Sequence, residues 1–133
     1  MGKKLTENKK TVLIVEDDRE MLDLLSRVLS KRGYIAIKAE DGTKAMAIAS
    51  EIRPDLTILD LNLPDCDGIE ILGRLKAMQA SAQVIILTGY GSQDAARSAM
   101  ETGAFDFLTK PFDIDEVCAV VKEALLSEPP MVN

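Results

Sequence analysis

The sequence predicts a single α/β domain built on a parallel β-sheet. Strand and helix signals alternate along the chain with little sequence between them, which is typical of strand–helix–strand units. Three continuous apolar runs are short enough for strands and do not alternate with polar residues, as expected for strands covered by helices on both faces. These runs are residues 12–15, 56–59 and 84–87. With 133 residues, 47% of them hydrophobic, the chain has the size of one domain and enough apolar material for its core.

Two further segments have the character of edge strands, because polar residues interrupt their apolar pattern. They are residues 34–38 and 105–109. If the three apolar strands lie in the middle and all crossovers are right-handed, the strand order is 2-1-3-4-5. The predicted architecture is therefore a flavodoxin-like, doubly wound sheet of five parallel strands with five helices.

Amphipathic segments fill the intervals between the strands. In residues 18–32 the apolar side chains recur on one helical face, and Gly33 follows where a helix commonly ends. Residues 43–51 and 113–126 repeat the pattern, and Asp113 stands where an N-cap belongs. We expect the folded domain to cover residues 11–126. A flexible arm would precede it in residues 1–10, and a tail or linker would follow in residues 127–133.

Charge and composition exclude several classes of function. The chain has 22 acidic and 16 basic residues, and its net charge of −6 disfavours direct binding to nucleic acid. It has no histidine, which excludes histidine-based catalysis and histidine metal sites. No apolar run is long enough to span a membrane and the first ten residues are polar and basic, so we expect a cytoplasmic protein without a membrane partner.

The two cysteines do not form a zinc-binding pattern. Cys66 and Cys118 lie far apart in the sequence, and free thiols are the simplest interpretation in a cytoplasmic domain. Asp65 and Asp67 flank Cys66 and should raise the pKa of its thiol, which would make it a slow nucleophile.

Polar residues follow the predicted strands at their carboxyl ends. They are Glu16, Asp17 and Asp18 after the first strand, Asp60 after the third, Thr88 after the fourth, and Thr109 and Lys110 at the last. In an open parallel sheet, ligands bind outside the carboxyl ends where the winding direction changes, here between the first and third strands. Each residue alone also fits a structural role, such as helix capping by Asp17 or Asp18. Capping does not explain Asp60 or Lys110, so the joint pattern favours a site.

The expected clustering of carboxylates indicates a cation. Two carboxylates about 4 Å apart repel by about 4 kcal/mol at an effective dielectric constant near 20. Such a cluster raises its own pKa values or binds a cation, and an all-oxygen set suits Mg²⁺ together with a phosphate group. Lys110 can neutralise a further negative group, and the Thr88 hydroxyl can donate to a phosphoryl oxygen. Asp60 is the natural nucleophile, because carboxylates can form aspartyl phosphate.

At these residues the sequence resembles the receiver domain of two-component response regulators. The resemblance covers residues 11–126 and is carried by residues 12–18, 59–64 with 67–68, 87–89 and 108–112. It implies that Asp60 is the phosphorylated aspartate and that Lys110 is the lysine typical of the family's active site. It also implies that Thr88 and Phe107 are the hydroxyl and the aromatic residue that change position when the domain is phosphorylated. It also implies a cis Lys110–Pro111 bond, with a trans turn as the alternative.

The same resemblance implies a magnesium site. The ligands would be Asp17, Asp60 and the main-chain carbonyl of Asn62, with Glu16 acting through water. Three acids follow the first strand, so the acid pair is either Glu16–Asp17 or Asp17–Asp18. We prefer the first pair, because it comes directly after the last strand residue. Phe107 has no hydroxyl with which to form a hydrogen bond when it reorients.

The function implied by the resemblance is a phosphoacceptor switch. A sensor histidine kinase or a phosphotransfer protein would phosphorylate Asp60, Thr88 would move toward the phosphate, and Phe107 would fill the space. The mobile element would be residues 92–102, a helix whose inner face offers mainly Ala95, Ala96, Ala99 and Met100. That helix, the last strand and the last helix would form the surface that controls an unknown output domain or protein, and homodimerisation there is possible.

Two rival functions are weaker. A phosphatase of the haloacid-dehalogenase type also uses a strand-end aspartate with Mg²⁺, but it needs a second aspartate where this chain has Asn62. A flavin-binding electron carrier shares the fold. It would need a phosphate-cradling loop after the first strand, where this chain has acids.

Overall fold

The structure is a computed structural model that describes residues 9–89 and 93–127. Its centre is one parallel β-sheet with the strand order β2-β1-β3-β4-β5, which confirms the predicted order. The strands are β1 (Thr11–Val15), β2 (Ile35–Ala39), β3 (Leu56–Asp60), β4 (Gln83–Thr88) and β5 (Asp106–Thr109).

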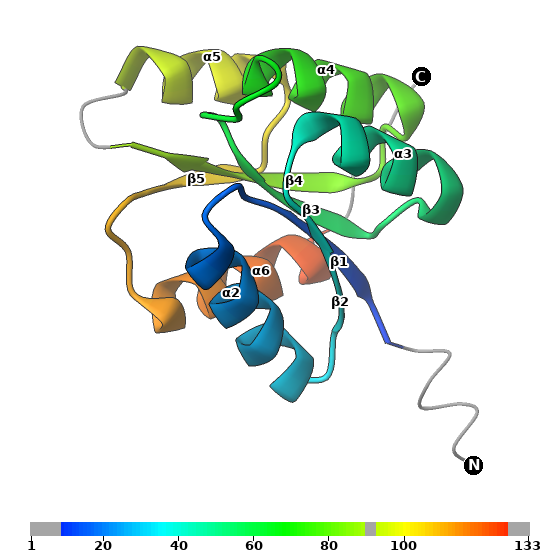
Figure 1. Cartoon of the computed structure of the whole chain (residues 1–133), viewed down its shortest axis with the longest axis vertical. Helices are drawn as coiled ribbons and strands as arrows, with labels where there is room; N and C mark the ends of the chain where they lie inside the picture. Colours follow the sequence, from blue (N-terminus) through cyan, green and yellow to red (C-terminus); the bar gives the residue numbers. More distant parts are fainter. Residues whose placement is uncertain (1–8, 90–92, 128–133) are drawn as a thin grey trace.

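Five helices cover the sheet on both faces. They are α2 (Arg19–Lys31), α3 (Gly42–Ile52), α4 (Gly68–Met78), α5 (Gln93–Thr102) and α6 (Ile114–Leu126). Figure 1 shows α3, α4 and α5 on one face and α2 and α6 on the other. Within the described residues, none of these helices combines the length and the apolar character that crossing a membrane would need. The doubly wound architecture is as predicted.

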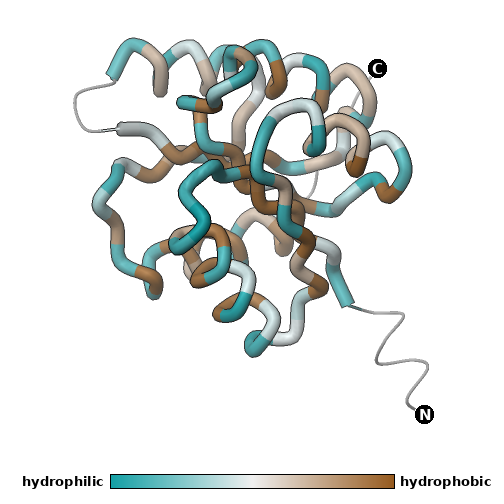
Figure 2. Tube along the Cα trace, in the orientation of Figure 1, coloured by the Kyte–Doolittle hydropathy of each residue, from teal (hydrophilic) through white to brown (hydrophobic). Residues whose placement is uncertain are grey.

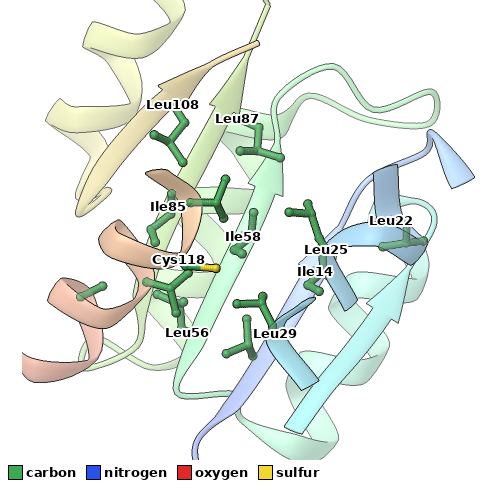
Figure 3. Close-up of a cluster of buried hydrophobic side chains, with 14 residues drawn as sticks. Ile14, Leu22, Leu25, Leu29, Leu56, Ile58, Ile85, Leu87, Leu108 and Cys118 are labelled. Atoms are coloured by element: carbon green, nitrogen blue, oxygen red, sulfur yellow. The ribbon is translucent and has the colours of Figure 1, made fainter. Parts of the chain in front are cut away.

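The core consists of two hydrophobic layers, one on each face of the sheet. The layer under α2 and α6 is drawn in Figure 3 and includes Ile14, Ile58 and Leu87. The opposite layer packs Leu13, Leu59 and other strand residues against α3 and α4. All residues of β3 and β4 are buried, and Figure 2 shows the hydrophobic stretches running through the centre of the molecule. This explains why the central strands are continuous apolar runs.

The first helix and second strand meet at a tight junction. Gly33 adopts φ +99°, a conformation that favours glycine. The N–H of Gly33 donates to the carbonyl of Ser30 at 3.1 Å, and that of Tyr34 donates to the carbonyl of Leu29 at 3.2 Å. The Tyr34 N–H is thus used to close the end of α2, and β2 begins at Ile35 rather than at the predicted residue 34.

Two details of the helices differ from expectation. Asp113 occupies the N-cap position of α6, but its side chain makes no capping hydrogen bond with the described residues. Met100 was expected on the inner face of α5, yet it is 40% exposed, and only Ala96 and Ala99 of the described helix are buried. Ser92, the predicted start of this helix, lies outside the described residues.

Candidate functional site

The carboxyl ends of β1 and β3 bring two acidic side chains together. The two strands are paired with Val15 opposite Leu59, so Glu16 and Asp60 occupy neighbouring positions at one edge of the sheet. Both side chains are buried: Glu16 is 0% exposed and Asp60 is 3% exposed. Buried carboxylates require compensating partners, because burial disfavours the charged form.

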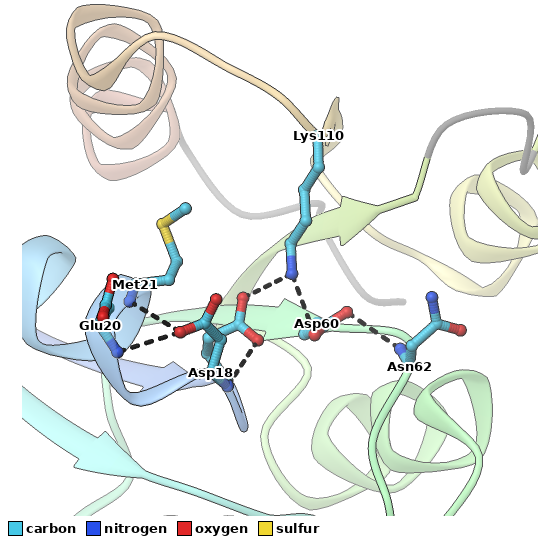
Figure 4. Close-up of polar contacts among 7 residues, drawn as sticks. Asp18, Glu20, Met21, Asp60, Asn62 and Lys110 are labelled. Carbon is cyan, nitrogen blue, oxygen red and sulfur yellow. Dashed lines mark hydrogen bonds and ion pairs between the residues drawn. The ribbon is translucent and has the colours of Figure 1, made fainter.

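Lys110 is one such partner. It follows the edge strand β5, and its side chain reaches both acids. Its Nζ donates to Glu16 Oε1 at 2.7 Å and to Asp60 Oδ2 at 3.2 Å (Figure 4). Its backbone N–H donates to the Thr88 carbonyl at 2.8 Å, and the Lys110–Pro111 bond is cis, as implied by the resemblance. The lysine thus bridges the carboxylates that follow β1 and β3.

Asp17 completes a cluster of three carboxylates. One oxygen from each of Glu16, Asp17 and Asp60 lies within 4.8 Å of the others. Asp17 is exposed, so the cluster opens to solvent on its side. Asp18 has a different role: its Oδ1 accepts hydrogen bonds from the N–H groups of Glu20 at 3.0 Å and Met21 at 3.3 Å at the start of α2 (Figure 4). The geometry therefore groups Glu16 and Asp17, rather than Asp17 and Asp18, with Asp60.

The crowded charges change the protonation of the buried acid. Burial, the hydrogen bond to Asp60 and the negative charge of Asp60 raise the pKa of Glu16 from its ordinary value of 4.5 to about 7, against the opposing effect of Lys110. Burial alone would lower the pKa of Lys110, but its hydrogen bond to Glu16 and the two negative charges raise it. Lys110 therefore stays positively charged beside these acids.

The residues present fit a hard divalent cation. The cluster offers only oxygen atoms, and its open side at Asp17 leaves room for water, as Mg²⁺ sites require. Asn62 lies beside it, and its N–H donates to Asp60 Oδ1 at 3.0 Å (Figure 4). Zinc or copper would prefer nitrogen or sulfur ligands, which this cluster lacks.

The two expected switch residues share one face of the sheet. Phe107 pairs with Ile86 in the β4–β5 register, and Thr88 lies two residues beyond Ile86, so the strand alternation directs Phe107 and Thr88 to the same side. Thr88 is buried, whereas Phe107 is 40% exposed. The ring of Phe107 therefore reaches the surface in this structure.

Comparison with known sequences decides the family. The family model described as "Response regulator receiver domain" matches residues 12–122. The chain belongs to this family. It is a phosphoacceptor switch of two-component systems, and receiver domains take their phosphoryl group from a histidine kinase or a phosphotransfer protein.

Relatives of this receiver domain differ in their overall length. The chain is 43% identical over 114 residues to sporulation initiation phosphotransferase F of Bacillus subtilis, covering 86% of this chain and 92% of that protein. It is 38% identical to the DNA-binding transcriptional regulator NtrC of Salmonella typhimurium over 86% of this chain, but this is only 24% of that protein. One relative is therefore of similar length to this chain, whereas in the other the matched part is about a quarter of the protein.

Solved structures agree with this assignment. The receiver domain of NtrX from Brucella abortus superposes with a TM-score of 0.84 at 32% identity, covering 88% of this chain and 99% of that one. Receiver domains typically use Mg²⁺, which is consistent with the carboxylate cluster of Glu16, Asp17 and Asp60.

The sequence pattern did not reveal every polar contact near this site. The sequence indicates Asp65 only as a neighbour of Cys66, but its carboxylate accepts hydrogen bonds from N–H groups at the start of α3. Both cysteines are free, as predicted. Burial, a hydrogen bond to Asp65 and nearby negative charges raise the pKa of the Cys66 thiol to about 11, as predicted for Asp65. Asp67 is not among these causes; its carboxylate caps α4 by accepting a hydrogen bond from the Ile69 N–H.

Proposed function

We propose that Asp60 is the residue that accepts the phosphoryl group, with Mg²⁺ bound beside it. The observation that carries this proposal is the position of Asp60, whose carboxylate is buried at the end of a central strand and lies 3.2 Å from Lys110 Nζ. A buried carboxylate with a neighbouring cation and further acids has the parts needed for phosphoryl transfer.

The transfer forms one bond and breaks another. An oxygen of the Asp60 carboxylate forms a bond to phosphorus as the phosphorus–nitrogen bond of the donor phosphohistidine breaks, which leaves an acyl phosphate and a free histidine on the partner. Lys110 neutralises part of the charge that arrives, and the Thr88 hydroxyl donates to a phosphoryl oxygen. The chain thereby assists its own phosphorylation by positioning and charge neutralisation.

Asp17, Asp60 and the main-chain carbonyl of Asn62 are the proposed ligands of Mg²⁺, and Glu16 acts through water. When bound, the ion supplies positive charge beside the transferred group and orients it. Asp17 is exposed and its carboxylate is close to that of Asp60. A metal ion in the solvent can therefore reach Asp17 directly. The carboxylate of Asp18 is engaged at the start of α2 and is left out of this set.

We assign the response to Thr88, Phe107 and α5. Movement of Thr88 toward the phosphoryl group would open space on the face that it shares with Phe107, and the aromatic ring would turn inward. The surface of α5, β5 and α6 would then change for an output domain, a separate protein or a second copy of the chain. We propose no direct contact of this domain with nucleic acid, in keeping with its net charge of −6.

The decisive experiment is phosphorylation by a small donor such as acetyl phosphate in the presence of Mg²⁺. Intact-mass analysis should show one added phosphoryl group on the wild-type chain and none on Asp60→Ala. Asp18→Asn is the matched control, because it changes a nearby acid that caps α2 and should be phosphorylated like the wild type. Equal modification of the Asp60→Ala chain would refute the assignment of Asp60.

A further inference from the structure

The loop that carries Asn62 is tied to a second helix by Asp65. This loop, residues 61–67, connects β3 to α4, while the side chain of Asp65 lies at the start of α3. Asp65 Oδ1 accepts a hydrogen bond from the Gly42 N–H at 2.9 Å. Asp65 Oδ2 accepts from the Thr43 N–H at 3.0 Å and from the Thr43 hydroxyl at 2.8 Å. One carboxylate therefore joins segments that are more than twenty residues apart in the chain.

This contact does more than cap α3, because the helix has a cap of its own. Asp41 is the N-cap residue, and its Oδ1 accepts from the Lys44 N–H at 2.8 Å. Asp65 satisfies two other N–H groups of the same helix end, where the helix dipole also favours a negative charge. The hydrogen bonds from the Gly42 N–H and the Thr43 hydroxyl hold the pKa of Asp65 well below its usual range, so this carboxylate stays ionised further into the acidic range than an ordinary aspartate.

The remainder of the loop makes further contacts that restrict its movement. Asn62 and Asp67 form an isolated antiparallel bridge across the loop. Gly68 packs so closely on Leu61 that a Cβ there would lie 2.5 Å from the Leu61 Cα. At the other end, the Asn62 N–H donates to Asp60 Oδ1 at 3.0 Å. Because Asp65 and Asn62 belong to the same short loop, we expect a shift at Asp65 to displace Asn62 and the Asp60 carboxylate that it contacts.

We propose that Asp65 is a positioning residue for the magnesium site. By anchoring loop 61–67 to α3, it holds the Asn62 carbonyl and the Asp60 carboxylate in place before the ion binds. Without this anchor, binding must also order the loop, which costs conformational entropy and lowers affinity. The inference rests on the proposed function, since it assigns Asp65 a role toward the same ligands.

The test compares Asp65→Ala, Asp65→Asn and Asp41→Ala in Mg²⁺ titrations of the whole chain, followed by the amide NMR signals of Asp60 and Asn62. Loss of a group that hydrogen-bonds to a metal ligand typically weakens metal binding about 10–100-fold. Asp65 acts on the ligands through the loop, so we expect the dissociation constant of Asp65→Ala to rise by the lower end of this range, about tenfold. Asp65→Asn should be intermediate, because its single side-chain oxygen replaces only part of the hydrogen bonding. Asp41→Ala removes a cap from the same helix end without touching the loop, and it should bind Mg²⁺ like the wild type.

The outcomes separate the two proposals. Equal weakening in Asp65→Ala and Asp41→Ala would overturn the positioning role, because fraying of α3 would then explain the loss. Wild-type affinity in both Asp65 variants would overturn it as well, and Asp65→Asn provides this answer even where Asp65→Ala fails to fold. A wild-type chain whose Asp60 and Asn62 signals do not respond to Mg²⁺ would instead contradict the proposed function itself.

Discussion

Glu16 is a buried acid whose charged form is disfavoured by its surroundings. It is 0% exposed, and it shares Lys110 with Asp60, so one ammonium group faces two buried carboxylates. Its pKa is raised from 4.5 to about 7, first by burial and then by Asp60. Folding therefore competes with ionisation of this side chain.

Glu16 should make the folded state less stable as the pH rises toward neutrality. The unfolded chain releases this proton near pH 4.5, but the folded protein keeps it to about pH 7, so the folded state binds more protons in this window. The free energy of unfolding, measured with urea at several pH values between these limits, should fall with increasing pH in the wild type. Glu16→Gln should remove this contribution, and Glu20→Gln, an exposed glutamate in the first turn of α2, should keep it. Identical pH slopes in the wild type and Glu16→Gln would contradict the raised pKa.

At this scale the sequence revealed which residues stand at strand ends but not which residues they contact. Glu16 and Asp60 could be identified because each follows an apolar run, and Lys110 because it stands at the end of the last predicted strand. The Glu16–Lys110 hydrogen bond joins residues 94 positions apart, and the exact partner of each group depends on side-chain geometry. The contact between Asp65 and Gly42 was missed for the same reason: it joins a loop without a periodic signal to the start of α3.

In the described structure, α5 has much less apolar anchoring than α2. Its buried residues are Ala96 and Ala99, whereas α2 buries Leu22, Leu25 and Leu29. Burying a leucine side chain contributes roughly 1.5–3 kcal/mol, which is more than an alanine can supply. The exposure of Met100 reduces the anchoring further than the sequence indicated.

We therefore expect α5 to open more readily than α2. In native-state hydrogen exchange, the amides of α5 should exchange at least about tenfold faster than those of α2, because local opening follows the number of buried contacts. The interior amides of α2, near Leu25, provide the reference within the same sample. Equal protection of the two helices would show that small residues simply allow close packing, and that α5 is not a weakly held element.

The boundaries of elements were harder to predict than their existence. All five strands follow from the three apolar runs and the two mixed segments, yet β2 and β5 each start one residue later than predicted. For β2, the Tyr34 N–H closes the end of α2. Met100 was placed on the wrong face because helical spacing alone does not tell which flank of an alanine-rich helix meets its neighbour. These differences arise from tertiary contacts, which override local patterns.

On the scale of the whole molecule, the proposed metal site would couple ion binding to folding. Oxygen atoms of Glu16, Asp17 and Asp60 approach one another only when β1 and β3 are paired. An ion that binds this arrangement and not the unfolded chain stabilises the folded state by RT ln(1 + [L]/Kd).

Added Mg²⁺ should therefore raise the melting temperature of the protein. At a concentration tenfold above the dissociation constant, the gain is about 1.4 kcal/mol by this relation. Asp17→Asn should lose most of the Mg²⁺-dependent shift, because it removes a proposed ligand. Asp18→Asn should retain the shift, since asparagine can still cap α2. A full shift in Asp17→Asn, read by circular dichroism or calorimetry, would point to Glu16 or Asp18 as the ligand.

The large sequence separation between Lys110 and its partner Glu16 has a consequence for synthesis of the protein. Glu16 lies 94 residues earlier, so during translation the acids emerge from the ribosome well before the lysine. A nascent chain that stops before β5 would present Asp60 without the ammonium group that faces it in the finished domain. If Asp60 accepts the phosphoryl group as proposed, assistance from Lys110 would begin only after the last strand of this domain has been made.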